Sequence, residues 1–298
     1  MTSTTIFGQP LISVVIPAYN RARLIPRALK SIQQQTHRNW EAIIVDDGST
    51  DETAEVAARL AREDERIRFL RQEKNAGAQA ARNLGIRAAR GEWVAFLDSD
   101  DVFLPESLEI RLKALIQESL SVVYSDCNCI EPDGTIKRYG IPPLSGWIHD
   151  RLLTHEGPLF QTLMVSKQAL VRIGYLDEKV VAFQEWDTAI RLAKYYPFAF
   201  VSTPTFLYDT RHSDSMSQNY LAGARGYEQV FHKNRVRILL FAGPGGLARL
   251  YQTAASWYER AGERASVRRC KLMAQVWSSL DIRTAFWKVR KALHLTNA

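Results

Sequence analysis

The first hundred residues of the chain alternate between short apolar runs and stretches with helical spacing, and this alternation constrains the fold more than any other feature. Runs that predict strands lie at residues 12–16, 41–45, 66–70 and 93–97. Stretches whose apolar residues recur at helical spacing lie between them, at residues 24–35, 51–64 and 78–89. This order predicts a parallel sheet whose strands are joined by right-handed helical crossovers. Ligands bind to such sheets beyond the carboxyl ends of the strands.

The alternation is less regular after residue 105, where a helix is predicted up to about residue 117. Further strands are predicted at residues 122–131, 159–165, 198–202 and 205–208, the last two as a pair. The sequence Pro132-Asp133-Gly134-Thr135 predicts a hairpin turn. From residue 220 onward helical spacing dominates, with a predicted break at Gly243.

The length and the charge distribution predict two parts of different character. The chain has 298 residues and a net charge of +7, which is long enough for one large α/β domain with an appendage. Residues 220–298 hold 14 Lys and Arg against 4 Asp and Glu, a net of +10, whereas residues 1–219 hold 25 against 28, a net of −3. We therefore expect a domain over residues 9–219 and a basic helical extension over residues 220–298. The slightly acidic domain argues against nucleic acid as a partner.

The cysteines and the hydropathy pattern predict a cytoplasmic protein. Cys127, Cys129 and Cys270 provide neither a disulfide framework nor the two pairs of a zinc site. No apolar run approaches the roughly 18 residues that a membrane-spanning helix needs. The first residues also lack the basic and apolar regions of a signal peptide.

Polar clusters follow three of the predicted strands. They are Pro17-Ala18-Tyr19-Asn20, Asp46-Asp47-Gly48-Ser49 and Asp98-Ser99-Asp100-Asp101. Because the carboxyl ends of parallel strands share one edge of the sheet, we expect these clusters to converge there. Carboxylates spaced as in the third cluster repel one another unless a cation lies between them, and Mg²⁺ or Mn²⁺ prefers such oxygen ligands. The alternative is that these acids cap the following helix.

Five motifs, in this order along the chain, resemble the signatures of family 2 glycosyltransferases. They are VIPAYN at residues 15–20, VDDGSTD at 45–51, NAG at 75–77, ARN at 81–83 and GEWVAFLDSDD at 91–101. The resemblance covers about residues 10–217. It implies an α/β GT-A fold, a Rossmann-like and mostly parallel sheet flanked by helices, and an inverting transfer of sugar from a nucleotide-sugar donor. The favoured donor is a UDP-sugar, and the expected cofactor is Mn²⁺ or Mg²⁺. The expected acceptor is a hydroxyl group of a saccharide or of a lipid-linked molecule.

The resemblance and the side-chain chemistry together imply a donor site. Its expected residues are Pro17, Tyr19, Asn20, Asp47, Asn75, Gly77, Arg82, Asp98 and Arg211. Tyr19 is expected to stack on the base, and Asp47 to accept the N3–H of a uracil-like base. Arg82 is expected to reach a phosphate or an acid on the ribose side. Two alternatives stay open: Tyr19 packs a loop against the sheet, and Arg82 lies on the solvated face of an Ala-rich helix.

The resemblance also divides the acidic run into roles. Asp100 is the expected direct metal ligand, whereas Asp98 holds the ribose, or the metal through water. His212 is expected to complete the metal shell or to contact the diphosphate. Asp101 ranks third among the three acids, because it serves equally well as the N-terminal brace of the next helix.

An inverting transfer needs a base that takes the proton of the acceptor hydroxyl. Glu185 falls at the position where the family places this base, although Gln184 replaces the acid that usually precedes it. Asp187 is expected to be structural, because Asp187 and Arg191 are spaced as an i,i+4 helix pair.

Two other classes of protein fit parts of the pattern. Residues 98–102 match D-x-D-x-[TV], the nucleophile motif of haloacid-dehalogenase-like phosphatases, but that motif follows an early strand and here three strands precede it. A non-catalytic sugar-nucleotide-binding protein would share the binding motifs without consuming the donor. Neither G-x-G-x-x-G nor G-x-x-x-x-G-K-[ST] occurs, which argues against dinucleotide and P-loop sites.

The end of the chain has the pattern of a basic amphipathic helix. From Ile282, apolar residues recur at positions 286, 289 and 293 among basic residues. Such a helix docks on an anionic membrane surface, here the cytoplasmic face of an inner membrane, or caps the catalytic domain with its charged face in water.

Overall fold

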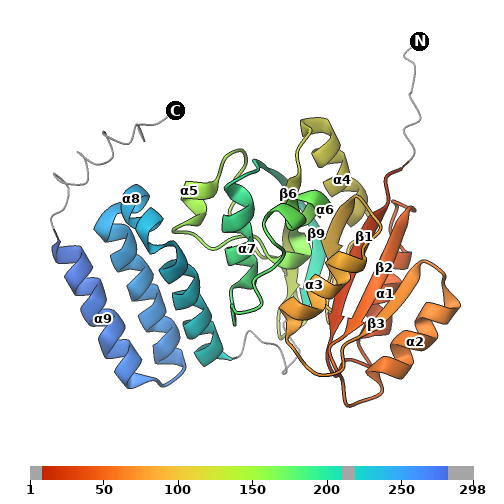
Figure 1. The fold of residues 1–298 in the computed structure, drawn as a ribbon, viewed down its shortest axis with the longest axis horizontal. Coiled ribbons are helices and arrows are strands. Elements are labelled where there is room, and N and C mark those ends of the chain that lie inside the picture. Colours follow the sequence, from red (N-terminus) through yellow and green to blue (C-terminus); the bar gives the residue numbers. More distant parts are fainter. Residues whose placement is uncertain (1–8, 210–218, 281–298) are drawn as a thin grey trace, which may run out of the picture. The chain divides into compact units, whose positions relative to one another are not determined.

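The computed structural model describes residues 9–209 and 219–280 of the chain, which fold into two units (Figure 1). The first unit takes its residues from Met1–Ile148, Pro158–Glu178 and Arg191–His212, and the second from His149–Gly157, Lys179–Ile190 and Ser213–Ala298. The second unit therefore combines the C-terminal helices with two segments that lie well before them in the sequence. The division into a domain at residues 9–219 and an extension at 220–298 remains a prediction.

A nine-stranded sheet, counted over the described residues, forms the centre of the first unit. Its N-terminal half has the order β3-β2-β1-β4 and is parallel throughout. The strands are β1 (Ile12–Ala18), β2 (Trp40–Asp46), β3 (Ile67–Arg71) and β4 (Trp93–Phe96), and the helices between them are α1 (Ile25–Gln33), α2 (Thr53–Glu63) and α3 (Ala78–Ala88). The predicted alternation is confirmed, and every residue of β1 and β2 is buried, as is typical of parallel strands covered on both faces.

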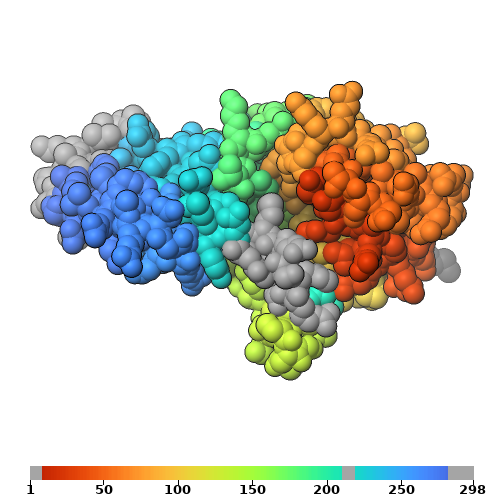
Figure 2. Space-filling model, turned by 90° about the horizontal axis from the view of Figure 1, so that it is seen from below, coloured from red at the N-terminus to blue at the C-terminus, as the bar shows by residue number. Residues whose placement is uncertain are grey.

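Beyond β4 the sheet becomes mixed and continues in the order β8-β6-β9-β5, with β7 beside β6. Its strands are β5 (Val102–Phe103), β6 (Val122–Ile130), β7 (Ile136–Arg138), β8 (Met164–Ser166) and β9 (Phe198–Asp209), accompanied by the helices α4 (Ser107–Glu118) and α6 (Lys167–Arg172). β6 and β7 form the predicted hairpin. The exposed residues around its turn, yellow-green in Figure 2, stand out from the surface of this unit.

Two predictions of strands in this half are wrong. Within residues 159–165, Phe160–Thr162 form a 3-10 helix, η1, and strand structure begins only at Met164. The buried guanidinium of Arg111 accounts for η1, because its Nη1 donates to the carbonyl groups of Gln161 and Leu163 at 3.0 Å each. Residues 198–202 and 205–208 form one strand, β9, because shifts in the register with β6 accommodate Pro204.

The part of the second unit that the structure describes is helical. It contains α5 (His149–Leu152), the first turns of α7 (Gln184–Ala193), α8 (Tyr220–Arg260) and α9 (Arg264–Ser279). α8 consists of two helices joined across a kink at Gly243, whose φ of 66° and ψ of −174° are not helical, so the predicted break is confirmed. No helix in the described ranges has both the length and the apolar character needed to cross a bilayer.

Candidate active site

The register of the parallel strands brings the polar clusters to one edge of the sheet. The pairs that set this register are Ala18 of β1 with Asp46 of β2, and Val15 of β1 with Phe96 of β4. Tyr19 and Asp47, the next residues along each strand, therefore lie at the same height at the end of the sheet. Asp98, two residues beyond Phe96, lies at the height of Pro17, which is two residues beyond Val15. Tyr19 remains 41% exposed, so part of its ring faces solvent at this edge.

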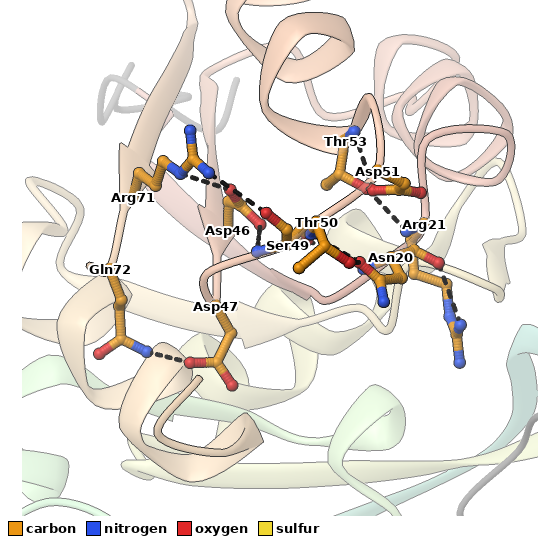
Figure 3. Close-up of polar contacts among 10 residues, drawn as sticks. All are labelled: Asn20, Arg21, Asp46, Asp47, Ser49, Thr50, Asp51, Thr53, Arg71 and Gln72. Carbon is orange, nitrogen blue, oxygen red and sulfur yellow. Dashed lines mark hydrogen bonds and ion pairs between the residues drawn. The ribbon is translucent and has the colours of Figure 1, made fainter. Parts of the chain in front are cut away.

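Asn20 ties the loop after β1 to the loop after β2 (Figure 3). Its φ of 54° is left-handed, its N–H donates to the Ser49 hydroxyl at 2.9 Å, and its Oδ1 accepts the N–H of Thr50 at 3.0 Å. Asp46 shapes the same loop, since its Oδ1 accepts the N–H of Ser49 at 3.0 Å and its Oδ2 lies 3.2 Å from Nε of Arg71. Asn20, an expected donor-site residue, thus uses its side-chain oxygen to join the two loops.

The carboxylate of Asp47 holds the loop that precedes α3. Its Oδ1 accepts the side-chain amide of Gln72 at 2.6 Å (Figure 3) and the N–H of Ala76 at 2.8 Å, and its Oδ2 accepts the N–H of Gly77 at 2.8 Å. These N–H groups lie at the N-terminus of α3, where a negative charge is stabilised by the helix dipole. The carboxylate of Asp47 thus holds the loop that contains the expected residues Asn75 and Gly77.

Gly48 allows this loop to approach the end of β2. Its φ of 71° lies in the left-handed region that favours glycine. A Cβ atom at Gly48 would also lie 2.7 Å from the backbone N of Asn75 and 2.7 Å from the backbone C of Lys74. Any larger residue would push the two loops apart.

Arg82 and Gln161 bind the two oxygens of Asp98. Nη2 of Arg82 lies 2.5 Å from Oδ1 of Asp98, and Nε2 of Gln161 lies 2.8 Å from Oδ2. Arg82 is only 5% exposed, and its guanidinium lies over the ring of Phe160, 4.5 Å from the centroid. The alternative that placed Arg82 on a solvated helix face is therefore wrong, because the side chain turns inward to this acid.

Asp101 is buried and braces the acidic loop from within. Its Oδ2 accepts Nε2 of Gln161 at 2.6 Å, and its Oδ1 accepts the N–H of Asp209 at 3.3 Å. Burial, together with the charges of the two neighbouring aspartates, raises the pKa of Asp101 well above its ordinary value. The alternative role of Asp101 as the brace of the next helix is wrong, since strand β5 intervenes before α4 begins at Ser107.

Arg27 of α1 fixes the backbone that carries the Asp100 carboxylate. Nη2 of Arg27 donates to the carbonyl oxygen of Asp100, and Nη1 lies 3.0 Å from the carboxylate of Asp209. The Asp100 residue is partly exposed, in contrast to the buried Asp101 beside it.

Gln161 and Arg27 were not among the residues predicted for the site. Gln161 is separated from Asp98 by 63 positions, and Arg27 from Asp209 by 182. No spacing in the sequence relates residues so far apart, and an isolated Gln or Arg carries no motif. Only the folded chain reveals that they support the acidic loop.

Glu185 lies in the first turn of α7, within the second unit, and is partly exposed. Asp187 is 1% exposed, and its Oδ1 accepts a hydrogen bond from Nζ of Lys233 on α8 at 2.5 Å. Nη2 of Arg191, the residue expected to pair with Asp187, donates to the carbonyl oxygen of Tyr175 at 2.7 Å. Asp187 thus joins α7 to α8.

The acidic loop carries two carboxylates of the kind that bind a divalent cation together with the phosphates of a substrate. Within residues 9–209 and 219–280, no three His, Cys, Asp or Glu side chains come together as a ligand set. Mg²⁺ commonly binds through one or two carboxylates and the phosphates of a substrate. Asp98 and Asp100 supply carboxylates of this kind. Arg211 and His212, expected to contact the diphosphate and the metal, lie outside the described residues.

Comparison with known proteins extends these observations. The sequence profile of Glycosyl transferase family 2 matches residues 13–176. TuaG of Bacillus subtilis, provisionally assigned to teichuronic acid biosynthesis, is 37% identical over 157 residues, 52% of this chain and 60% of TuaG. WfgD of Escherichia coli, a UDP-Glc:alpha-D-GlcNAc-diphosphoundecaprenol beta-1,3-glucosyltransferase, is 32% identical over 132 residues, 44% of this chain and 51% of WfgD. The matches thus span between half and three fifths of these relatives.

A solved structure resembles the chain over nearly its whole length. The mannosyltransferase PcManGT from Pyrobaculum calidifontis, solved with GDP-Man and Mn²⁺, superposes with a TM-score of 0.65 at 20% identity, covering 98% of this chain and 82% of PcManGT. The predicted GT-A fold is therefore confirmed. Because the family profile covers more than half of the chain and the fold agrees with it, the chain belongs to glycosyl transferase family 2.

Proposed function

We propose that the protein is a metal-dependent, inverting glycosyltransferase that moves a sugar from a UDP-sugar to an acceptor hydroxyl group during synthesis of a cell-surface polysaccharide or another glycoconjugate. The shared sheet edge carries the proposal, since Tyr19, Asp47 and the Arg82–Asp98 pair lie at the ends of neighbouring strands. The names of TuaG and WfgD support a cell-surface product, and the name of WfgD supports a UDP-linked sugar.

Binding of the donor uses the residues of this edge. Tyr19 stacks on the base, an interaction worth about 1–3 kcal/mol, and Pro17 and Asn20 shape the loop that carries it. Asp47 accepts the N3–H of the base while it holds the first turn of α3. The positive N-terminus of that helix, bordered by Asn75 and Gly77, attracts the diphosphate.

Transfer is a single displacement in this proposal. The acceptor oxygen attacks the anomeric carbon on the face opposite the diphosphate, Glu185 takes the hydroxyl proton, and the bond from the anomeric carbon to the diphosphate oxygen breaks. Asp100, with Asp98 and His212, would hold Mn²⁺ or Mg²⁺, and the ion would supply positive charge next to the diphosphate. Arg211 binds the same phosphates, and Arg82 holds Asp98 toward the ribose.

A donor screen tests the proposal. The full chain is incubated with Mn²⁺ and a panel of nucleotide sugars, and both thermal shift and slow donor hydrolysis are measured. We expect UDP-sugars to give the largest shift and measurable hydrolysis. A protein that is stabilised by a nucleotide sugar but consumes none of them would be a binding protein, and a panel without any thermal shift would contradict the donor site.

Two variants separate the roles of the carboxylates. Asp100→Asn should lose the Mn²⁺-dependent part of donor binding as well as turnover, because it removes a charged metal ligand. Glu185→Gln should bind the donor normally and lose at least about a hundredfold in turnover, within the range for general base catalysis. Near-normal turnover in either variant would show that its role is assigned wrongly.

We also propose a cytoplasmic protein whose acceptor is lipid-linked, a class that the name of WfgD supports. Residues 281–298, outside the described residues, then dock on an anionic membrane surface. Co-sedimentation of the full chain and of a chain ending at Leu280 with vesicles, with and without anionic lipid, tests this. Binding that needs both anionic lipid and residues 281–298 is expected, and binding by neither chain would favour the alternative of a helical cap.

A further inference from the structure

The segment that leads into α7 contains a strained residue two positions before Glu185. Phe183 has a φ of 56°, in the left-handed region that only glycine adopts without cost. Such a conformation persists in a folded protein where the surrounding structure enforces it, and it is often found near functional residues. The residues that enforce it here come from α8.

Aromatic side chains of α8 surround the ring of Phe183. The ring centroid of Phe183 lies 5.2 Å from that of Tyr227 and 5.4 Å from that of Trp257, with the planes nearly perpendicular in both pairs. Trp186 of α7 lies 6.3 Å from Phe183 and 5.1 Å from Tyr227. The three contacts of Phe183 are edge-to-face, a favoured geometry for aromatic pairs, so its ring has a defined place beside α8.

The backbone of α8 also touches the backbone of this segment directly. A Cβ atom at Gly226 would lie 2.5 Å from the carbonyl oxygen and 2.6 Å from the nitrogen of Ala182. One turn further along α8, the side chain of Gln229 accepts the N–H of Val181 at 3.1 Å and donates to the carbonyl oxygen of Lys179 at 3.4 Å. A glycine and an amide side chain therefore dock α8 onto an otherwise irregular chain segment.

A third contact lies on the other side of Glu185. Lys233, one further turn along α8, pairs with the buried carboxylate of Asp187. Glu185 is thus bracketed by Phe183 and Asp187, and both of these residues are held by α8. Figure 1 shows α7 beside the first half of α8 within this unit.

We propose that the first half of α8 positions Glu185 for catalysis, through Gly226 and Gln229 on the segment before it and Lys233 on the segment after it. This inference rests on the proposed function, in which Glu185 is the base. The helices after residue 219 are then part of the catalytic apparatus, in addition to any role at a membrane. Gly226, Gln229 and Lys233 are positioning residues, because they act through the backbone that carries Glu185.

The chemistry explains why such support matters. A general base acts only within hydrogen-bond reach of the proton it takes. A displacement of about 1 Å costs on the order of a hundredfold in rate. A looser segment should therefore lower kcat and leave binding of the nucleotide unchanged, since the donor-site residues at the sheet edge belong to the first unit.

Three variants of the full chain test this proposal, with kcat and the donor KM measured for the donor found in the screen. Gly226→Ala inserts a methyl group against the backbone of Ala182 and should lower kcat at least tenfold. Gln229→Ala removes two hydrogen bonds from a partly exposed side chain, so it should fold normally and lower kcat about three- to tenfold. Gly245→Ala is the matched control on the same helix, because its Cβ atom would meet only the flexible end of Arg249 at 3.9 Å, and it should keep wild-type kcat.

Binding of UDP with Mn²⁺ by calorimetry completes the test. The expected result for Gly226→Ala and Gln229→Ala is an unchanged Kd for UDP together with the lower kcat. Wild-type kcat in Gln229→Ala, or a loss of UDP affinity equal to the loss of kcat, would overturn the positioning role. Normal turnover in Glu185→Gln would instead overturn the assignment of the base, and the two failures are thereby distinguished.

Discussion

At the scale of single residues, the acidic loop is supported by a neutral side chain. Gln161 donates to Asp98 and to Asp101 from the same amide nitrogen, at 2.8 and 2.6 Å. A Lys or Arg side chain at residue 161 would make similar bonds but would add a positive charge beside the carboxylates that attract a cation. A glutamine joins the two acids without adding a positive charge to that of Arg82, which already pairs with Asp98.

Gln161→Ala should therefore impair the site without unfolding the protein. Arg111 binds the backbone carbonyl of residue 161, so η1 keeps its support after the substitution. A hydrogen bond to a charged group contributes about 1.5–3 kcal/mol, so loss of the bond to Asp98 alone should lower kcat/KM about ten- to a hundredfold. Steady-state kinetics with thermal denaturation checks this, and Gln117→Ala, an exposed glutamine on α4, is the control. A kcat/KM equal to that of the control would show that Gln161 does not matter for the loop.

Gly48→Ala should destabilise the protein and weaken donor binding. A left-handed φ costs a non-glycine residue about 1–2 kcal/mol, and here the new methyl group also meets the backbone of residues 74 and 75. Gly134→Ala is the matched control, because its φ of 85° is also left-handed but no atom lies within 4 Å of its Cβ position. The free energy of unfolding should drop by more for Gly48→Ala than for Gly134→Ala. An equal loss of unfolding free energy in the two variants would mean that the contact between the loops contributes nothing to stability.

At the scale of elements, α9 is joined to α8 by one buried carboxylate. Glu228 accepts two hydrogen bonds from Arg269, at 2.9 and 2.6 Å, and one from the hydroxyl of Tyr258 at 2.7 Å. Burial alone would raise the pKa of Glu228, but the bonds from Arg269 and Tyr258 outweigh it and leave this pKa below its ordinary value. The charged form is therefore favoured in the folded protein, and the cluster connects both halves of α8 with α9.

Glu228→Gln should lower stability at pH 7 by about 1–2 kcal/mol, at the low end for charged hydrogen bonds because Arg269 is about half exposed. A depressed carboxyl pKa adds stability above the ordinary value of 4.5, and this is lost as pH falls through the folded pKa. The difference from wild type should thus be constant above about pH 7, where the neighbouring His232 is neutral, and shrink below pH 4.5. Denaturant titrations across this range test it, with the exposed Glu259→Gln as control. If the difference in unfolding free energy between Glu228→Gln and wild type does not change with pH, the ion pair of Glu228 with Arg269 is not its cause.

At the scale of the whole molecule, each of the two units buries at least one cysteine. Cys127 and Cys129 lie in the sheet of the first unit, and Cys270 lies on α9 in the second, on the side that faces Glu228 of α8. Burial, followed by nearby negative charges, raises the pKa of Cys127 and, to about 11, that of Cys270. Burial also raises the pKa of Cys129. The thiols thus report whether each unit is folded.

All three thiols should resist iodoacetamide at pH 8 in the native protein and react fully in denaturant. The thiolate is the reactive form, and burial of each thiol both raises its pKa and shields it from the reagent. Mass spectrometry along a urea series should show when each cysteine becomes labelled, and so whether the first and second units unfold together. Rapid labelling of any thiol in the native protein would contradict its burial.

The sequence alone determined the order of strands and helices, the fold class and the family. These follow from local periodicity and from motifs of adjacent residues, such as VDDGSTD at 45–51. The same information placed the polar clusters at the sheet edge, because strand direction in a parallel sheet decides where every strand ends. The local patterns failed at η1, where a buried arginine outweighs strand propensity, and at β9, where register shifts with β6 keep one strand continuous past Pro204.

Only the tertiary structure decided which side chains support the site. Gln161 meets Asp98, and Arg27 meets the Asp100 backbone, across separations of 63 and 73 positions. It also decided that α8 holds the segment on either side of Glu185. The physical reason is that hydrogen bonds, ion pairs and close backbone contacts depend on distances of a few ångströms in space. Local sequence patterns determine how each segment folds, but they leave open which distant segments come within that range.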